Sequence, residues 1–147
     1  MKRIINEMKL RLPAKSVHEA TARSIISAFV AELSPSVEEL GDLRCAVSEA
    51  VTNCIVHAYK GLPEGQPGPI YISARLYDTR EVTIEISDNG CGIADVEAAR
   101  APNFTTGESF ERWGMGFRVM ESFTDSLSVK SKPGKGTTVL MKKILGP

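Results

Sequence analysis

The stretch Ser-Asp-Asn-Gly-Cys-Gly-Ile at residues 87–93 decides how this chain is interpreted. It follows a run at 82–86 in which apolar and polar residues alternate, so Asp88 is expected where a strand ends. A carboxylate fixed there can accept a hydrogen bond from an exocyclic amine such as that of adenine, and Gly90 and Gly92 let the main chain approach a ligand closely. Because Asp-Asn-Gly is also strong turn chemistry, this stretch alone fits either a tight turn or a ligand site.

The composition is that of one soluble globular domain. The chain has 147 residues, and 18 Lys and Arg balance 18 Asp and Glu, so the bulk charge does not indicate a nucleic-acid or membrane partner. No apolar run reaches transmembrane length and the N-terminus lacks the core of a signal peptide, so we expect a cytoplasmic protein. Cys45, Cys54 and Cys91 form no Cys-x-x-Cys pair, and we expect them to be reduced and buried.

The N-terminal half predicts one strand and two helices. Residues 7–12 alternate as an edge strand that Pro13 ends. Ser16 followed by Glu19 indicates a capping box for a helix over 17–33. Ser36 and Glu39 repeat this signature, and a second helix is expected from 37 to about 59.

The second helix carries side chains that could bind a metal ion or act as a base. Glu49, Asn53 and His57 are spaced by four and share one side, and Ala46 and Ala50 between them are small enough to leave space for a ligand. Asn53 offers an oxygen to Mg²⁺, and Glu49 can orient or deprotonate a hydroxyl group. A solvated polar stripe is the alternative for an isolated Glu-x-x-x-Asn, and His57 alone is expected to hydrogen-bond at the helix end.

The C-terminal half predicts a hairpin, a lid and a glycine-rich helix start. Strands are expected at 70–76 and 82–86, a short helix at 95–100, and an irregular lid at 101–113. Gly114-Met115-Gly116-Phe117 is expected to open a helix, whose free N–H groups would attract phosphate, although a lone Gly-x-Gly is weak evidence. Two strands around a Lys-rich turn at 132–136 follow. The chain has no Walker loop and lacks the motif set of eukaryotic-type kinases.

Taken in order, these motifs resemble the ATPase family shared by gyrase, Hsp90 chaperones, histidine kinases and MutL (GHKL). Three segments are more closely similar to the anti-sigma F family, the serine kinases of spore-forming bacteria: Ala-Val-Ser-Glu-Ala-Val-Thr-Asn at 46–53, Asn-Phe-Thr-Thr at 103–106 and Glu-Arg-Trp-Gly-Met-Gly-Phe at 111–117. Trp113 departs from that pattern, where a small residue is expected. The resemblance implies an α+β fold of the GHKL (Bergerat) type, a two-layer α/β sandwich whose mixed, mostly antiparallel sheet is covered on one face by helices, as a single ATP-binding kinase domain over 1–147.

The resemblance also implies a function. Proteins of this family are homodimers that bind ATP or ADP with Mg²⁺ and hold a sporulation sigma factor, sigma F, inactive. They transfer phosphate from ATP to a serine of an anti-anti-sigma factor, which disables that antagonist. Neither direct nucleic-acid binding nor a membrane partner is expected.

Roles carry over to matching positions. Glu49 would be the general base, Asn53 the Mg²⁺ ligand and an ATP contact, and Asp88 the reader of adenine N6. Arg112 would stabilise charge on the transferred phosphoryl group, and the first helix with Arg23 would contact a second copy and the sigma factor. The remaining ATP-binding positions are Gly90 and Gly92 beside the ring, Thr137 on the adenine side, and Thr105, Thr106, Gly114, Met115, Gly116 and Phe117 around the phosphates.

Three other functions are weighed. A histidine kinase needs a phosphoacceptor helix pair before the ATPase domain; His18-Glu19 echoes such a site, but only a short strand precedes it. A nucleotide-controlled sigma-binding module without kinase activity is the serious alternative, and Glu49 argues against it because binding needs no base. A freestanding ATPase that drives a conformational cycle is the third alternative, and we expect no transducer domain of the kind that gyrase-like and chaperone relatives carry.

Overall fold

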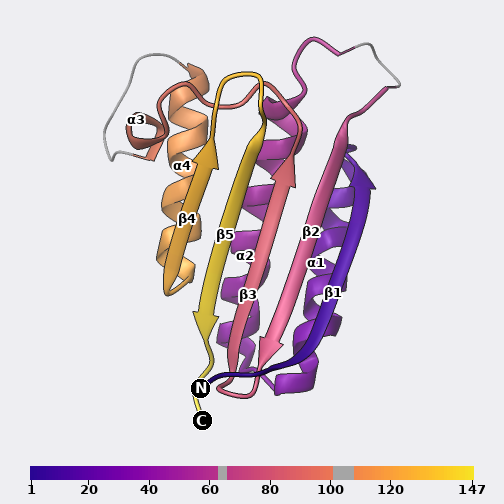
Figure 1. Cartoon of the computed structure of the whole chain (residues 1–147), viewed down its shortest axis with the longest axis vertical. Helices are drawn as coiled ribbons and strands as arrows, with labels where there is room; N and C mark the ends of the chain where they lie inside the picture. The colour runs from indigo at the N-terminus through magenta and orange to yellow at the C-terminus, as the bar shows by residue number, and fades with distance from the viewer. Residues whose placement is uncertain (63–65, 101–107) are drawn as a thin grey trace.

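The computed structural model describes residues 1–62, 66–100 and 108–147, except for the side chains of 108–114. A five-stranded sheet forms one layer and helices cover one of its faces (Figure 1). The strands are β1 (Ile4–Pro13), β2 (Pro69–Tyr77), β3 (Glu81–Asp88), β4 (Ser126–Ser131) and β5 (Thr137–Ile144), in the spatial order β1-β2-β3-β5-β4. The expected α+β sandwich is confirmed, but all strand pairs in the described residues are antiparallel, so the sheet there is not mixed as expected.

The helical layer is built around its central helix. The helices are α1 (Val17–Val30) with a 3₁₀ extension η1 (Ala31–Leu33), α2 (Val37–Asn53) with a π-helical extension η2 (Cys54–Ala58), α3 (Val96–Arg100) and α4 (Glu108–Phe123). α2 packs between α1 and α4 behind the sheet (Figure 1). The core lies between the layers, where Ile26, Val47, Ile84 and Phe117 are buried.

The two expected capping boxes differ in outcome. At Ser36 both hydrogen bonds with Glu39 are present, which confirms the second box. The first is wrong, because the Ser16 side chain makes no capping hydrogen bond. Its backbone already has helical angles (φ −55°, ψ −33°), whereas a capping residue is typically extended. Glu19 instead pairs with Arg23 one turn along α1.

The expected start of α4 is also wrong. The helix begins at Glu108, so Gly114 and Gly116 lie inside it and not before it. Glycine inside a helix costs about 1 kcal/mol relative to alanine, and tertiary packing must offset this. Phe117 and Met120, both fully buried, supply that packing.

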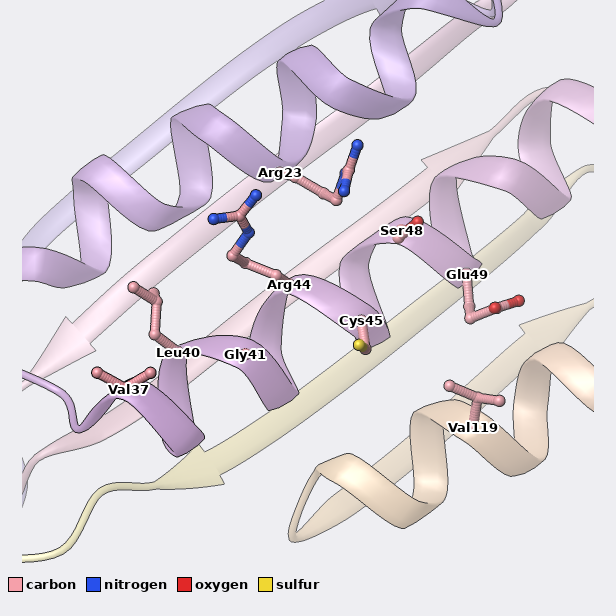
Figure 2. A pocket seen from close by; sticks show the side chains of 9 residues that line it. All are labelled: Arg23, Val37, Leu40, Gly41, Arg44, Cys45, Ser48, Glu49 and Val119. Carbon is pink, nitrogen blue, oxygen red and sulfur yellow. The ribbon is translucent and has the colours of Figure 1, made fainter.

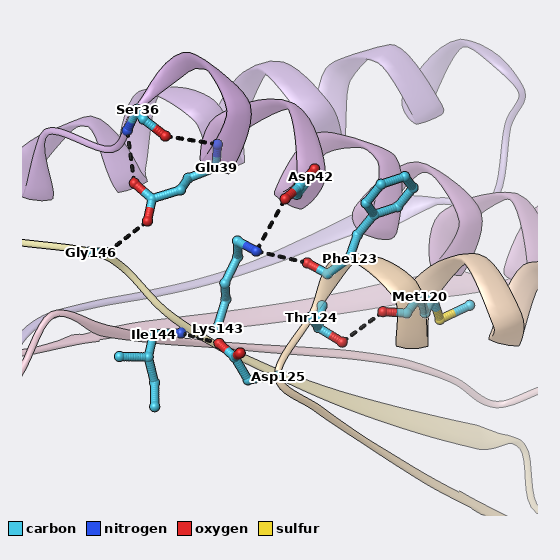
Figure 3. Close-up of polar contacts among 10 residues, drawn as sticks. All are labelled: Ser36, Glu39, Asp42, Met120, Phe123, Thr124, Asp125, Lys143, Ile144 and Gly146. Atoms are coloured by element: carbon cyan, nitrogen blue, oxygen red, sulfur yellow. Dashed lines mark hydrogen bonds and ion pairs between the residues drawn. The ribbon is translucent and has the colours of Figure 1, made fainter.

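A polar cluster fixes the C-terminal end of α4 at the end of the molecule that carries both termini (Figures 1 and 3). The amine of Lys143 on β5 donates to the carbonyl of Phe123, the last residue of α4, at 3.1 Å, and pairs with Asp42 of α2 at 3.3 Å. Nearby, the Asp125 carboxylate accepts from the Ile144 N–H at 2.6 Å. These contacts tie α2, α4 and β5 together, opposite the end where β3 terminates.

Lys143→Met is expected to lower the free energy of unfolding by about 1–3 kcal/mol. The Lys143 side chain is only 13% exposed, and its loss leaves a helix-terminal carbonyl and a carboxylate without their cation. Urea denaturation would measure the change. Lys142→Met is the matched control, because that amine is 40% exposed and 3.8 Å from Glu81; its loss should cost under about 0.5 kcal/mol. If the two substitutions lowered the free energy of unfolding equally, the stabilising role assigned to Lys143 would be wrong.

Candidate nucleotide and catalytic site

Asp88 is a buried carboxylate held from three directions. It ends β3, pairs with Thr137 of β5, and is 5% exposed. Its Oδ1 accepts from the N–H groups of Gly90 at 2.9 Å and Thr137 at 3.3 Å, and the Cys54 thiol donates to its Oδ2 at 3.4 Å. Burial raises the pKa of Asp88, which these hydrogen bonds partly counter. The side chain is therefore a fixed acceptor.

The glycines around Asp88 bring backbone segments together. A Cβ at Gly90 would collide with the carbonyl of Ala58 in η2, and one at Gly92 (φ +74°) would collide with the carbonyl of Lys132 in the β4–β5 turn. Protein backbone therefore fills the space that we expected these glycines to open for a ring. Their effect is to hold the loop after Asp88 against η2, where the Cys91 N–H donates to Ala58 at 2.8 Å.

Ser131 is a site neighbour that sequence reasoning missed. Its Oγ accepts from the Ile93 N–H at 2.8 Å, donates to the Gly136 carbonyl at 2.9 Å, and lies 2.8 Å from Thr137 Oγ1. Because the single Ser131 proton goes to Gly136, the Thr137 hydroxyl donates to Ser131 and keeps its own lone pairs free. Thr137 thus offers an acceptor beside Asp88, which only the pairing of β4 with β5 reveals.

Asn53, at the end of α2, has an unsatisfied amide. The residue is 5% exposed, and no hydrogen-bond partner reaches its Nδ2 among the residues that the structure describes. A Cβ at Gly116 of α4 would lie 3.0 Å from Nδ2 and 3.2 Å from Oδ1, so the glycine backbone packs directly on the amide. The unpaired atom is a donor, so it indicates a place for an acceptor such as a phosphate oxygen.

The other polar atom of this amide, Oδ1, fits a Mg²⁺ ion that is coordinated mainly by phosphates. Mg²⁺ prefers oxygen ligands and commonly takes only one or two from the protein. The described residues contain no cluster of three or more His, Cys, Asp or Glu side chains that would hold an ion by itself. Asn53 Oδ1 would be the protein ligand, and the ion would neutralise phosphate charge.

Glu49 lies one turn before Asn53 and is half-buried. Burial raises its pKa, and the Glu19 carboxylate of α1 raises it further. The expectation that Ala46 and Ala50 leave ligand space beside it is wrong, because both are buried in the core. His57 is also buried, in η2.

Glu49 opens instead onto a groove of about 440 Å³ between α1, α2 and α4 (Figure 2). Arg23 of α1 and Arg44 of α2 line the same groove, and Val119 of α4 lies across from Glu49. Arg23 pairs with Glu19 at 3.0 Å, and the Ser48 hydroxyl also donates to Glu19. Arg23 and Glu49 were predicted separately, and helix packing brings them to one groove.

The remaining expected site residues are less well defined. Thr105 and Thr106 lie outside the described residues, and for Arg112 and Gly114 only the helical backbone of α4 is described. Met115 is 66% exposed, whereas the Phe117 side chain is buried in the core. The three cysteines are free as expected, but Cys45 and Cys91 are exposed, so their expected burial is wrong.

The fold is that of the histidine kinase-like ATPase class, and a family model described as "Histidine kinase-like ATPase domain" matches residues 12–143. An anti-sigma F factor from Caldanaerobacter subterraneus subsp. tengcongensis is 51% identical over 96% of this chain and 95% of its own length. One from Clostridium acetobutylicum is 48% identical over 94% and 93%, respectively. This chain belongs to the anti-sigma F factor family.

Solved structures share the fold at low identity. The RsbU and RsbW domains of Rv1364c from Mycobacterium tuberculosis match 97% of this chain and 33% of that longer chain, with a TM-score of 0.68 and 20% identity. A histidine kinase domain from Erythrobacter litoralis matches 91% of this chain and 62% of that one, with a TM-score of 0.58 and 18% identity. Among the described helices, none has the length and apolar character needed to cross a membrane.

Proposed function

We propose that this protein is a cytoplasmic anti-sigma factor and an ATP-dependent protein serine kinase. It binds and inhibits a sporulation sigma factor, sigma F, and transfers the γ-phosphate of ATP to a serine of an anti-anti-sigma factor. The observation that carries the kinase activity is the position of Glu49: a half-buried carboxylate with a raised pKa that faces an open groove, one turn from the unsatisfied Asn53 amide.

The residues around Asp88 support recognition of adenine. Asp88 accepts a hydrogen bond from the N6 amine, and Thr137 adds an acceptor beside it. Asn53 Oδ1 would hold Mg²⁺, which would neutralise phosphate charge, and Gly116, which packs on that amide, would line the phosphate side with Gly114 and Met115. Thr105, Thr106 and Phe117 complete the residues proposed for the phosphate side, and Gly90 and Gly92 support the adenine side.

The groove beside Glu49 supports transfer of a phosphoryl group to a protein. A serine hydroxyl that enters the groove gives its proton to Glu49, and its oxygen bonds to the γ-phosphorus as the bond to the bridging oxygen of ADP breaks. The raised pKa of Glu49 suits a base, because a base acts best when its pKa approaches the working pH. Arg112 stabilises the negative charge on the transferred group.

Arg23 supports the assignment of partners to the same face. It lies in the groove wall, where its ion pair with Glu19 fixes its position. We assign this surface of α1 to the sigma factor and to the second copy in a homodimer. The relatives' name, anti-sigma F factor, is the reason to expect a sigma factor there.

Intact mass spectrometry tests the activity. The purified protein is incubated with Mg-ATP and its anti-anti-sigma partner, with and without EDTA, and phosphate should appear on the partner only when Mg²⁺ is available. Peptide mapping should locate it on a serine. Nucleotide binding without transfer would contradict the kinase and leave a nucleotide-controlled sigma-binding module, which co-purification with the sigma factor would then test.

A further inference from the structure

Cys54 makes a contact that the proposed chemistry does not use. It follows Asn53 directly as the first residue of η2, it is 4% exposed, and its Sγ lies 3.4 Å from Asp88 Oδ2. A carboxylate oxygen accepts hydrogen bonds, so the Cys54 thiol is the donor in this contact.

The two oxygens of Asp88 are occupied differently. Each carboxylate oxygen accepts about two hydrogen bonds. Two backbone N–H groups, from Gly90 and Thr137, already fill Oδ1. Among the described residues, Oδ2 receives only the long, weak S–H bond of Cys54, so one of its acceptor positions stays open. A ligand amine would bind at Oδ2.

We propose that Cys54 is a positioning residue for recognition of 6-aminopurines: its thiol holds Asp88 Oδ2 so that the open lone pair meets the exocyclic amine. This inference rests on the proposed role of Asp88 in reading adenine. A purine with a carbonyl at position 6 would face that oxygen with an acceptor and be rejected. A thiol suits this position because it restrains the oxygen while competing only weakly for its lone pairs.

The location of Cys54 adds a structural reason. Asn53 and Cys54 are consecutive, so the residue assigned to the metal and the residue that braces the base reader share one stretch of backbone. The change from α-helix to π-helix falls between them, and such π turns are frequent at functional sites. The junction of α2 and η2 thereby positions both residues together.

The test compares two nucleotides that differ by one amine. Isothermal titration would give Kd for ADP and for purine riboside 5′-diphosphate, which lacks the 6-amino group, on the full chain. Wild type should prefer ADP. Cys54→Ala should reduce that preference about three- to tenfold, the value of one hydrogen bond, and Cys54→Ser, which keeps a donor, should restore most of it. Cys54→Val removes the donor without emptying the volume and should behave like Cys54→Ala.

Controls separate positioning from packing. Val30→Ala truncates a buried side chain of α1 away from the site, and it should lower stability without changing the ratio of the two Kd values. Equal weakening of both ligands in Cys54→Ala and Cys54→Val, or an unchanged ratio, would overturn the inference and leave the proposed function intact. A wild-type protein without preference for ADP would instead overturn the role of Asp88, and the inference with it.

Discussion

Glu49→Gln is expected to lower the rate of phosphoryl transfer by about two to four orders of magnitude while ATP still binds. Glutamine has nearly the same size, so the groove keeps its shape, but its amide cannot accept the serine proton. Glu49 lines the groove and not the adenine end, where Asp88 is held by Gly90, Thr137 and Cys54. Initial rates of partner phosphorylation and the Kd for ATP, measured on the same preparations, separate the two functions.

Glu38→Gln is the matched control for this substitution. Glu38 lies on the same helix, in its exposed first turn and outside the groove, so transfer should proceed at the wild-type rate. Unchanged transfer in Glu49→Gln would remove Glu49 from the role of base. Loss of ATP binding in that variant would place Glu49 in the nucleotide site instead.

The pH dependence of stability gives an independent test of Glu49. A carboxyl group whose pKa is raised by folding binds its proton more tightly in the folded state, so its ionised form destabilises the fold at neutral pH. Glu49→Gln should therefore raise the thermal midpoint at pH 7. This gain should shrink as pH falls through the folded pKa and vanish below the unfolded one. A variant less stable than wild type at pH 7 would contradict the direction of this pKa shift.

The hairpin could be predicted from the sequence because only one face of the sheet is covered. Along β2 and β3 the buried side chains alternate with more exposed ones, and a slip of one residue would turn the buried set toward solvent. Register was therefore fixed by pattern, and with it the position of Asp88 at the end of β3. The Ser36–Glu39 box was equally local, since both partners lie within one turn.

The contacts that define the site could not be predicted in this way, because they join distant segments. Cys54 and Asp88 are 34 residues apart, and Ser131 meets Thr137 only because β4 pairs with β5. For Gly116 the prediction was wrong. The glycines around it favour a loop, but burial of neighbouring Phe117 against the core holds Gly116 in a helix. Tertiary packing overrode local propensity there.

α2 and its extension η2 therefore serve two surfaces at once. Glu49 faces the groove that we assign to protein partners, and Asn53 and Cys54 face the elements that we assign to the nucleotide. Because these residues lie on one continuous helical segment, their spacing is set by covalent geometry. This arrangement makes each side separable by a single substitution, and Asp88 is the corresponding probe of the nucleotide side.

Asp88→Asn is expected to weaken ATP binding by about 1.5–3 kcal/mol, or about 10- to 150-fold in Kd. The N–H groups of Gly90 and Thr137 would select the asparagine oxygen at the Oδ1 position. The NH₂ group would then replace Oδ2, where it would face both the Cys54 thiol and the adenine amine, so donors would meet donors. Since burial raises the pKa of Asp88, the neutral side chain should not destabilise the fold by loss of charge.

The strength of this test lies in its control. Asp78→Asn makes the same chemical change in the β2–β3 turn, where Asp78 pairs with Arg3 at the opposite end of the sheet from Asp88, and ATP affinity should not change. If Asp88→Asn bound ATP as tightly as wild type while both variants kept their fold by circular dichroism, Asp88 would be a structural strand terminus. The adenine would then have to bind elsewhere. Selective loss of affinity in Asp88→Asn alone would instead establish the carboxylate as the group that reads the base, since the control keeps the fold and undergoes the same change in net charge.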